Sequence, residues 1–256
     1  EYNISSALSF YLDLQYRHLD YTMKGIEDKN AVIDFDNKYS FFNPKAGINY
    51  TPSDAHRFYM SYSRAAKEPN RSDYTDSDIE PRPEYLDDIE IGYTYNKPKI
   101  NANVNVYYMY YTDQLVPTGE LDDSGYVIRS NVNKSYRLGV ELSATYKPLN
   151  WLQGHISLSL SDNVIKGLET ENGIKKNTKI SYSPSMISSA TISFAPIQNM
   201  NIDINARYVG EQYMSNNNIA ESLLDDYLVS DLSIMYNFKK GKVLPEITLR
   251  GKINNV

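Results

Sequence analysis

The sequence predicts an all-β fold, a transmembrane antiparallel β-barrel, and three observations carry that prediction. Apolar and polar residues alternate along many segments, as strands with one lipid face and one wet face require. Short turns and long polar loops follow one another in turn, which is typical of barrels with short periplasmic turns and long extracellular loops. The chain has 24 Tyr against 7 Phe and one Trp, and Tyr suits positions where a ring meets lipid and a hydroxyl meets water.

The alternation is clearest between residues 99 and 111. One face of this segment is apolar or aromatic and holds Ile100, Ala102, Val104, Val106, Tyr108 and Tyr110. The other face begins with three asparagines, at positions 101, 103 and 105. No helix separates these two sets, because its period is 3.6 residues. The segments near 8–17, 200–208 and 231–238 show the same split.

About eleven strands follow from this pattern. In chain order we expect them near residues 5–18, 39–50, 56–66, 84–96, 99–113, 126–147, 151–163, 185–195, 199–210, 227–238 and 245–255. The short turns each carry a proline, at Pro52, Pro98, Pro148, Pro196 and Pro245. The long loops fall near 19–38, 67–83, 114–125, 164–184 and 211–226. Because short turns of such barrels are periplasmic, every strand acquires a direction.

Composition excludes several classes of protein. A mean hydropathy of −0.53 and the lack of a long apolar run exclude a helical membrane protein. Zero Cys excludes disulfides, thiolate metal sites and cysteine nucleophiles. The net charge of −6 argues against a nucleic-acid partner, which calls for a basic face.

The sequence contains no recognisable catalytic motif. The three histidines His18, His56 and His155 show no metal-binding spacing, and no serine lies in a GxSxG elbow. We therefore expect no enzyme activity, no cofactor and no metal site.

Three loops carry possible binding chemistry, each beside a plainer interpretation. The charged loop 67–83 suggests a calcium site or a solvated surface, and its spacing does not match the EF-hand pattern. The lysines of 164–184 suggest attraction of an anionic ligand or lipopolysaccharide phosphate, or ordinary solubility. The Tyr and Asn residues of 211–218 suit recognition of a polar ligand, or a turn-rich connection.

Several segments resemble the TonB-dependent outer-membrane receptors, in order and over nearly the whole chain. The clearest is FYMSYSRAAKEPNRSD at 58–73, followed by PRPEYLDDIEIGYTY at 81–95. Further similar segments are YYMYYTDQLVPTGEL at 107–121, RLGVELSATYKPLNWL at 137–152, ARYVGEQYM at 206–214 and ITLRGKINNV at 247–256.

The resemblance implies a barrel of about 22 strands in the bacterial outer membrane. Residues 1–256 would then be a partial barrel, its C-terminal half without the last strand, and an odd count of eleven agrees because bacterial barrels have even strand numbers. The plug domain, the TonB box, the N-terminal strands and a signal peptide are expected outside this chain. Implied partners are TonB, the plug, a small ligand, and outer-membrane lipid and lipopolysaccharide.

The implied function is import of a scarce extracellular ligand, most often a ferric siderophore, driven by TonB. Haem, cobalamin and glycan importers share this fold, and a passive porin or a soluble all-β binding module are the rival interpretations. A porin lacks a plug and has about 16–18 strands. A soluble module does not explain why the short turns share one side.

Two sets of residues follow. Those expected to face the lumen, where they contact the plug or line a substrate path, are Asn101, Asn103, Asn105, Arg137, Glu141, Asp203, Arg207, Asp231, Arg250 and Lys252. Those expected to bind ligand, in loops and at upper strand ends, are Arg71, Tyr74, Arg82, Tyr111, Gln114, Tyr126, Arg129 and Tyr213.

Overall fold

The computed structural model describes residues 1–26, 32–75, 80–121, 125, 127–169, 175–238 and 247–255. The strands in chain order are β1 (Tyr2–Asn3), β2 (Leu8–Ile26), β3 (Val32–Ser53), β4 (His56–Lys67), β5 (Glu84–Lys97), β6 (Ile100–Leu121), β7 (Val127–Leu149), β8 (Leu152–Glu169), β9 (Lys175–Lys179), β10 (Met186–Phe194), β11 (Met200–Val209), β12 (Gln212–Tyr213), β13 (Leu223–Leu224), β14 (Tyr227–Phe238) and β15 (Ile247–Asn254). The short helical segments are α1 (Arg71–Thr75) and η1 (Ala220–Ser222). Neither has the length and apolar character needed to cross a membrane.

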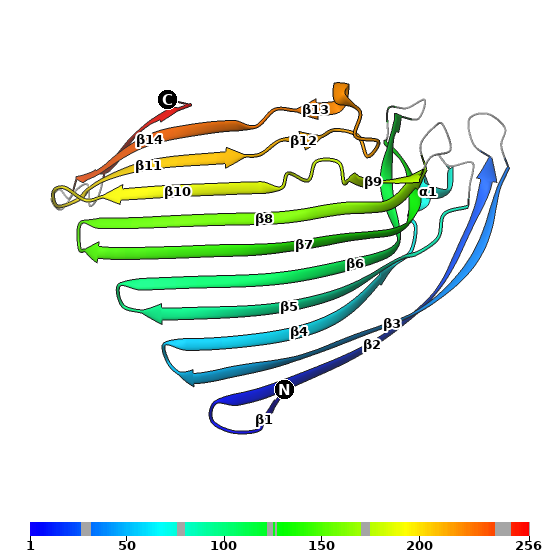
Figure 1. Ribbon diagram of the computed structural model, residues 1–256, viewed down its shortest axis with the longest axis horizontal. Helices are drawn as coiled ribbons and strands as arrows, with labels where there is room; N and C mark the ends of the chain where they lie inside the picture. Colours follow the sequence, from blue (N-terminus) through cyan, green and yellow to red (C-terminus); the bar gives the residue numbers. More distant parts are fainter. Residues whose placement is uncertain are drawn as a thin grey trace.

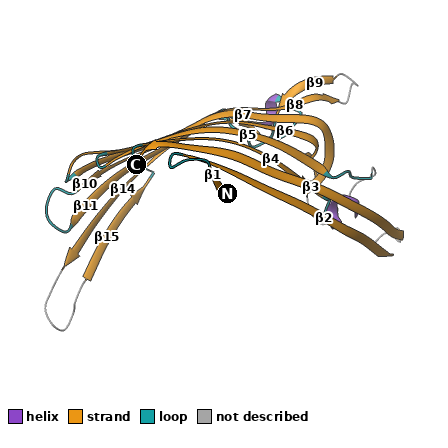
Figure 2. Ribbon diagram, turned by 90° about the horizontal axis from the view of Figure 1, so that it is seen from below, coloured by secondary structure: helices purple, strands orange, loops and turns teal. Residues whose placement is uncertain are grey.

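One antiparallel sheet contains nearly all the strands. Its order is β1-β2-β3-β4-β5-β6-β7-β8-β10-β11-β14-β15, with β9 paired to β8, while β12 and β13 form a separate pair. The strands therefore lie side by side in chain order (Figure 1), and the sheet is arched when seen from its edge (Figure 2). The eleven expected strands correspond to β2–β8, β10, β11, β14 and β15, which confirms the all-β antiparallel prediction.

The register gives the sheet one polar face and one apolar face. Direct partners run from Tyr59 through Gly92, Asn105 and Glu141 to Ser159 across β4–β8. Since side chains alternate with a period of two, a slip of one residue would reverse a strand's faces. These five residues are in register, so their side chains lie on one side of the sheet. That side is called the polar face below.

The apolar face has the height of a membrane. Its side chains include the exposed residues Leu14, Ile48, Met60, Ile91, Val106, Val140 and Leu160. In β7 this face is bounded by Tyr146 and Tyr136. At about 3.3 Å per residue and a tilt of about 45°, the stretch between them rises roughly 23 Å. This agrees with the apolar band of about 25 Å between aromatic girdles in membrane barrels.

The outer ends of the strands are longer than the sequence predicts. The expectation of a loop over 19–38 was wrong for the described residues, because β2 and β3 pair as far as Ile26 and Val32. The expected loop 114–125 was also wrong over 114–121, since β6 continues to Leu121. The expected loop 164–184 was wrong over 164–169 and 175–179, where β8 and β9 pair. The clean alternation stops at Asp113, whose φ is 55°. Above the lipid both faces meet water, so pairing persists there without the apolar pattern.

Three tyrosines on the polar face lie flat against a glycine of the next strand. The pairs are Tyr11 with Gly47, Tyr59 with Gly92 and Tyr107 with Gly139, each formed by direct cross-strand partners. A Cβ atom at any of these glycines would overlap the tyrosine ring. Glycine is required at these positions because the tyrosine ring lies close to its backbone. The ring covers backbone that the side chain of a larger residue would otherwise cover.

We predict that Gly92→Ala destabilises the folded sheet by about 1–3 kcal/mol, because the new methyl group must displace the Tyr59 ring. The measurement is the urea midpoint of the protein in detergent. Gly154→Ala is the matched control, since nothing lies within 4 Å of the position its Cβ would take. The double variant Tyr59→Ala/Gly92→Ala should lose less than the sum of the single changes, and strict additivity would contradict the ring–glycine contact.

Candidate functional site

The asparagines of β6 form a hydrogen-bonded row along the polar face. Asn101 donates to Asn96 at 3.3 Å, and Asn103 donates to Asn101 at 3.0 Å. Asn105 accepts from the Tyr59 hydroxyl at 2.9 Å and donates to Glu90 at 3.4 Å. The row therefore satisfies much of its own hydrogen-bonding capacity within the wall.

All ten residues expected to face the lumen lie on the polar face by their register. Besides the β6 asparagines these are Arg137, Glu141, Asp203, Arg207, Asp231, Arg250 and Lys252. Some are already paired within the wall, as Lys252 is with Asp231 at 3.2 Å. Contact with a plug or a substrate remains a prediction for each of them.

The outer half of the polar face contains a hollow of about 340 Å³. Its lining includes Tyr107, Arg137, Glu141 and Tyr182. At its rim Arg137 Nη1 donates to Ser183 Oγ at 3.2 Å. The guanidinium beside two phenol rings offers forked donors next to flat apolar surfaces, and the carboxylates of Glu90 and Glu141 line the same hollow.

Tyr182 is a lining residue that the sequence analysis missed. Its φ of 52° lies in the left-handed region, which is rare for a residue other than Gly, Asn or Asp. The side chain is 62% exposed, and its backbone N–H donates to Tyr213 O at 2.8 Å. No local pattern marks this position, because the conformation depends on that contact with a segment thirty residues away.

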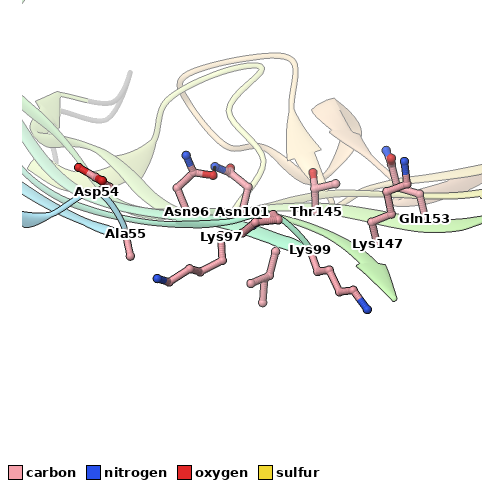
Figure 3. Close-up of a pocket in the computed structure, with 11 residues that line it drawn as sticks. Asp54, Ala55, Asn96, Lys97, Lys99, Asn101, Thr145, Lys147 and Gln153 are labelled. Atoms are coloured by element: carbon pink, nitrogen blue, oxygen red, sulfur yellow. Dashed lines mark hydrogen bonds between the residues drawn. The ribbon is translucent and has the colours of Figure 1, made fainter. Parts of the chain in front are cut away.

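A second hollow, of about 620 Å³, lies at the short-turn end of the sheet. Figure 3 shows Asn96, Asn101 and Thr145 on one side of the sheet and Lys97 and Lys99 pointing to the other. The polar face is therefore hollowed near both ends.

The loop after β4 is fastened to the β2–β3 hairpin. Arg17 donates to both oxygens of Glu68, the Nη1 bond measuring 2.9 Å, and its guanidinium lies 4.9 Å from the centre of the Phe41 ring. The hydrogen bonds from Arg17 hold the pKa of Glu68 below its usual value. This contribution to stability is present above the ordinary pKa of Glu and is lost as pH falls through the lowered one.

Tyr74 of α1 belongs to the same attachment. Its ring is 3% exposed and packs on Tyr21 and Phe35 at centroid distances of 5.6 and 4.8 Å. Its hydroxyl hydrogen-bonds with Tyr39 and accepts from Asn37 at 3.1 Å. Burial, and then the hydrogen bond with Tyr74, raise the pKa of Tyr39. The burial of Tyr74 assigns its ring to packing between hairpin and helix.

Asn131 of β7 clamps the end of the same loop. Its Oδ1 accepts from Arg82 N at 2.8 Å, while Nδ2 donates to Arg82 O at 2.9 Å and Asp113 O at 2.6 Å. The Arg82 side chain pairs with Asp113 at 2.7 Å and with Asn133 at 3.2 Å. The side-chain amide of Asn131 thereby makes hydrogen bonds to the loop backbone of the kind that a neighbouring strand would make.

Two asparagines clamp the 211–226 loop in the same way. Asn216 accepts from Ser181 N at 2.8 Å and donates to Pro117 O at 2.7 Å. Asn218 accepts from Lys179 N at 2.5 Å and donates to Lys179 O at 2.9 Å. Of the two interpretations of these asparagines, the geometry favours the connection over ligand recognition.

The remaining residues expected to bind ligand are not gathered into one site. Arg71 and Arg129 are exposed, Tyr111 lies on the polar face of β6, and Tyr213 is half-buried in β12. Gln114 accepts from Ser135 Oγ at 2.6 Å. Tyr126 lies outside the described residues. Within the described part of the chain, no group of three or more His, Asp or Glu side chains is placed to hold a metal ion.

We predict that Asn131→Asp loosens the end of the 67–83 loop, because a carboxylate cannot donate to the Arg82 and Asp113 carbonyls. Loss of these bonds should cost about 1–3 kcal/mol locally. Hydrogen exchange of the Glu80, Arg82 and Glu84 backbone amides should rise by tenfold or more. Asn133→Asp is the control, since among the described residues its side chain accepts from the Arg82 guanidinium and not from the loop backbone. Equal exchange in both variants would contradict the clamp.

Solved structures of known transporters share this fold. The ferric-catecholate import receptor Fiu from E. coli K12 is 15% identical to this chain, with a TM-score of 0.69. The match covers 99% of this chain and 38% of the Fiu chain. The FrpB iron transporter from Neisseria meningitidis is 16% identical with a TM-score of 0.70, covering 98% and 39%. The copper transporter OprC is 13% identical with a TM-score of 0.77, covering 98% and 39%.

The chain thus spans about two fifths of the length of these structures. No curated protein sequence matches it. The family model described as TonB dependent receptor-like, beta-barrel matches residues 1–256, its full length. Proteins of this family lie in the bacterial outer membrane, where the apolar face meets lipid. The chain therefore belongs to the TonB-dependent receptor β-barrel family.

Proposed function

We propose that residues 1–256 form part of the barrel of a receptor that binds a ferric siderophore outside the cell and imports it with energy delivered by TonB. The observation that carries the proposal is the hollow on the polar face, where Arg137, Tyr107 and Tyr182 converge. Support also comes from the transporters of similar fold, two of which are named for ferric-catecholate import and iron transport. In this proposal the plug and the TonB-contacting segment lie outside residues 1–256.

The residues of the hollow divide the work of binding. Arg137 would pair with an anionic group of the ligand, and the exposed Tyr182 ring would cover a planar part of it. At about 340 Å³ the hollow lies near the lower limit for small-molecule sites, so it suits one edge of a ligand that other parts of the lumen also contact. The clamped loops above it reduce the entropy lost on binding.

The test uses a strain deleted for the full-length gene and grown under iron limitation. The intact gene should restore growth and uptake of one labelled ferric siderophore, and collapse of the proton gradient should stop that uptake. Uptake that continues without the gradient would favour a passive porin. Growth and uptake that do not depend on the gene would instead direct attention to haem, cobalamin or glycans.

Within that assay, Arg137→Gln should weaken binding of the transported complex about tenfold or more, because a charge-assisted contact is lost. Arg57→Gln is the control, since Arg57 shares the polar face but lies near its short-turn end, where it donates to Asn49 Oδ1 at 2.8 Å. Cell-surface amounts of both variants are compared first. Unchanged affinity in Arg137→Gln at normal surface amounts would remove Arg137 from the site.

A further inference from the structure

The outer hollow adjoins a further hollow on the polar face, and Glu141 lines both. This further hollow, called the middle hollow below, has a volume of about 350 Å³, and its lining includes Asn103 and Ser143. The two hollows share Asn105, Glu141 and Ser159, which are direct partners across β6, β7 and β8. A ligand that enters the outer hollow can therefore extend into the middle hollow beside Glu141.

The charge of the lining changes sign along β7. Arg137 lies in the outer hollow, and Glu141 lies four positions nearer the short turns on the same face. Among the described residues that line the middle hollow, Glu141 is the sole charged one. The outer hollow holds one further carboxylate, that of Glu90. The inner end of the combined space is therefore negative, and it attracts a cation rather than an anion.

The Glu141 carboxylate is available to a ligand, whereas that of Glu90 is engaged by the wall. Glu90 accepts from the Tyr59 hydroxyl at 3.3 Å and from Asn105 Nδ2 at 3.4 Å. For Glu141 the described residues supply neither an ion pair nor a side-chain hydrogen bond. The residue is exposed, so its charge is solvated and costs the fold little. A bound cation would replace that water.

The ring of Tyr107 lies between the two charges. Gly139 is the residue midway between Arg137 and Glu141 on this face, and the Tyr107 ring lies against it, where a Cβ atom would overlap the ring. At about 3.3 Å per residue, the Cα atoms of Arg137 and Glu141 are roughly 13 Å apart along the strand. The face of an aromatic ring attracts ammonium groups and packs on methylene groups. Tyr107 therefore provides a floor that an alkylammonium chain can follow toward Glu141.

We propose that the transported complex carries a protonated amine, which binds between the Glu141 carboxylate and the face of the Tyr107 ring. The negatively charged oxygens that hold the iron then meet Arg137. This inference rests on the proposed import function, because it names the charge pattern of the ligand that the same site takes. Glu141 is a specificity residue in this arrangement, since it separates amine-bearing complexes from amine-free complexes of similar shape.

The test titrates the full-length protein in detergent, by calorimetry, with two ferric trihydroxamate complexes that differ at one group. One complex has a free terminal amine, and the other is acetylated on that amine, so that the charge is lost while the rest of the complex is kept. The amine complex should bind at least tenfold more tightly. Glu141→Gln should weaken binding of the amine complex about tenfold and leave binding of the acetylated complex unchanged.

Asp13→Asn is the matched control. It also removes one carboxylate from the polar face, but on β2, directly opposite Lys45 and five strands away from β7. Its affinity for each complex should equal that of the unaltered protein. Arg137→Gln should weaken binding of both complexes by the same factor, because the hydroxamate oxygens are common to both.

Equal affinity of the unaltered protein for the two complexes would overturn the proposal, as would equal losses of affinity in Glu141→Gln and Asp13→Asn. Failure to bind either complex would overturn it too. In each of these cases, gene-dependent and gradient-driven uptake of a siderophore that lacks an amine would leave the import function standing. Uptake that does not depend on the gene would instead remove the import function itself, so the two failures are distinguished.

Discussion

The structure depends on one constraint, the pairing of every backbone N–H and C=O group in the part of the chain that meets lipid. An unpaired group in hydrocarbon costs several kcal/mol, and only neighbouring strands can supply the partners here. The sequential antiparallel meander meets this requirement with short connections at one end. Once the strands are paired in register, the two-residue alternation alone places polar and apolar side chains on opposite faces. The tyrosine–glycine contacts then become possible, because Tyr59 and Gly92 are brought opposite each other.

The same constraint explains why many side chains of the polar face already have hydrogen-bond partners within the wall. Asn101, Asn103 and Asn105 bond to their neighbours along and across the strands, so their amides are largely occupied. The side chains that line the outer hollow include Arg137, which lies in the regular register of β7, and the exposed Tyr182, whose backbone departs from strand geometry. The regular wall thus supplies shape and a wet surface, and the segment around Tyr182 adds an exposed ring at its outer end.

The sequence could predict those features that the two-residue alternation within a single segment determines. The alternation from Ile100 to Tyr110 is sufficient to place a strand and to assign its faces, and the same reasoning placed Arg137 and Asp203 on the polar side. The outer ends of β2 and β3 escaped prediction, because pairing continues there without an apolar pattern. The buried ring of Tyr74 and the clamp at Asn131 also escaped it. Both depend on contacts with residues tens of positions away, which no spacing within one segment reveals.

One short stretch of β7 shows how closely these requirements are combined. Between Asn131 and Arg137 the chain clamps a loop, contributes Val132 to a small core with Ile165 and Ile180, and presents Lys134 to the lipid side. The next positions return to the regular pattern, with Tyr136 in the outer girdle and Arg137 at the hollow. Since neighbouring residues on a strand point to opposite faces, lipid contact and ligand contact can sit one residue apart without sharing a side chain. A strand that crosses the membrane boundary can therefore be changed at one face while the other keeps its contacts.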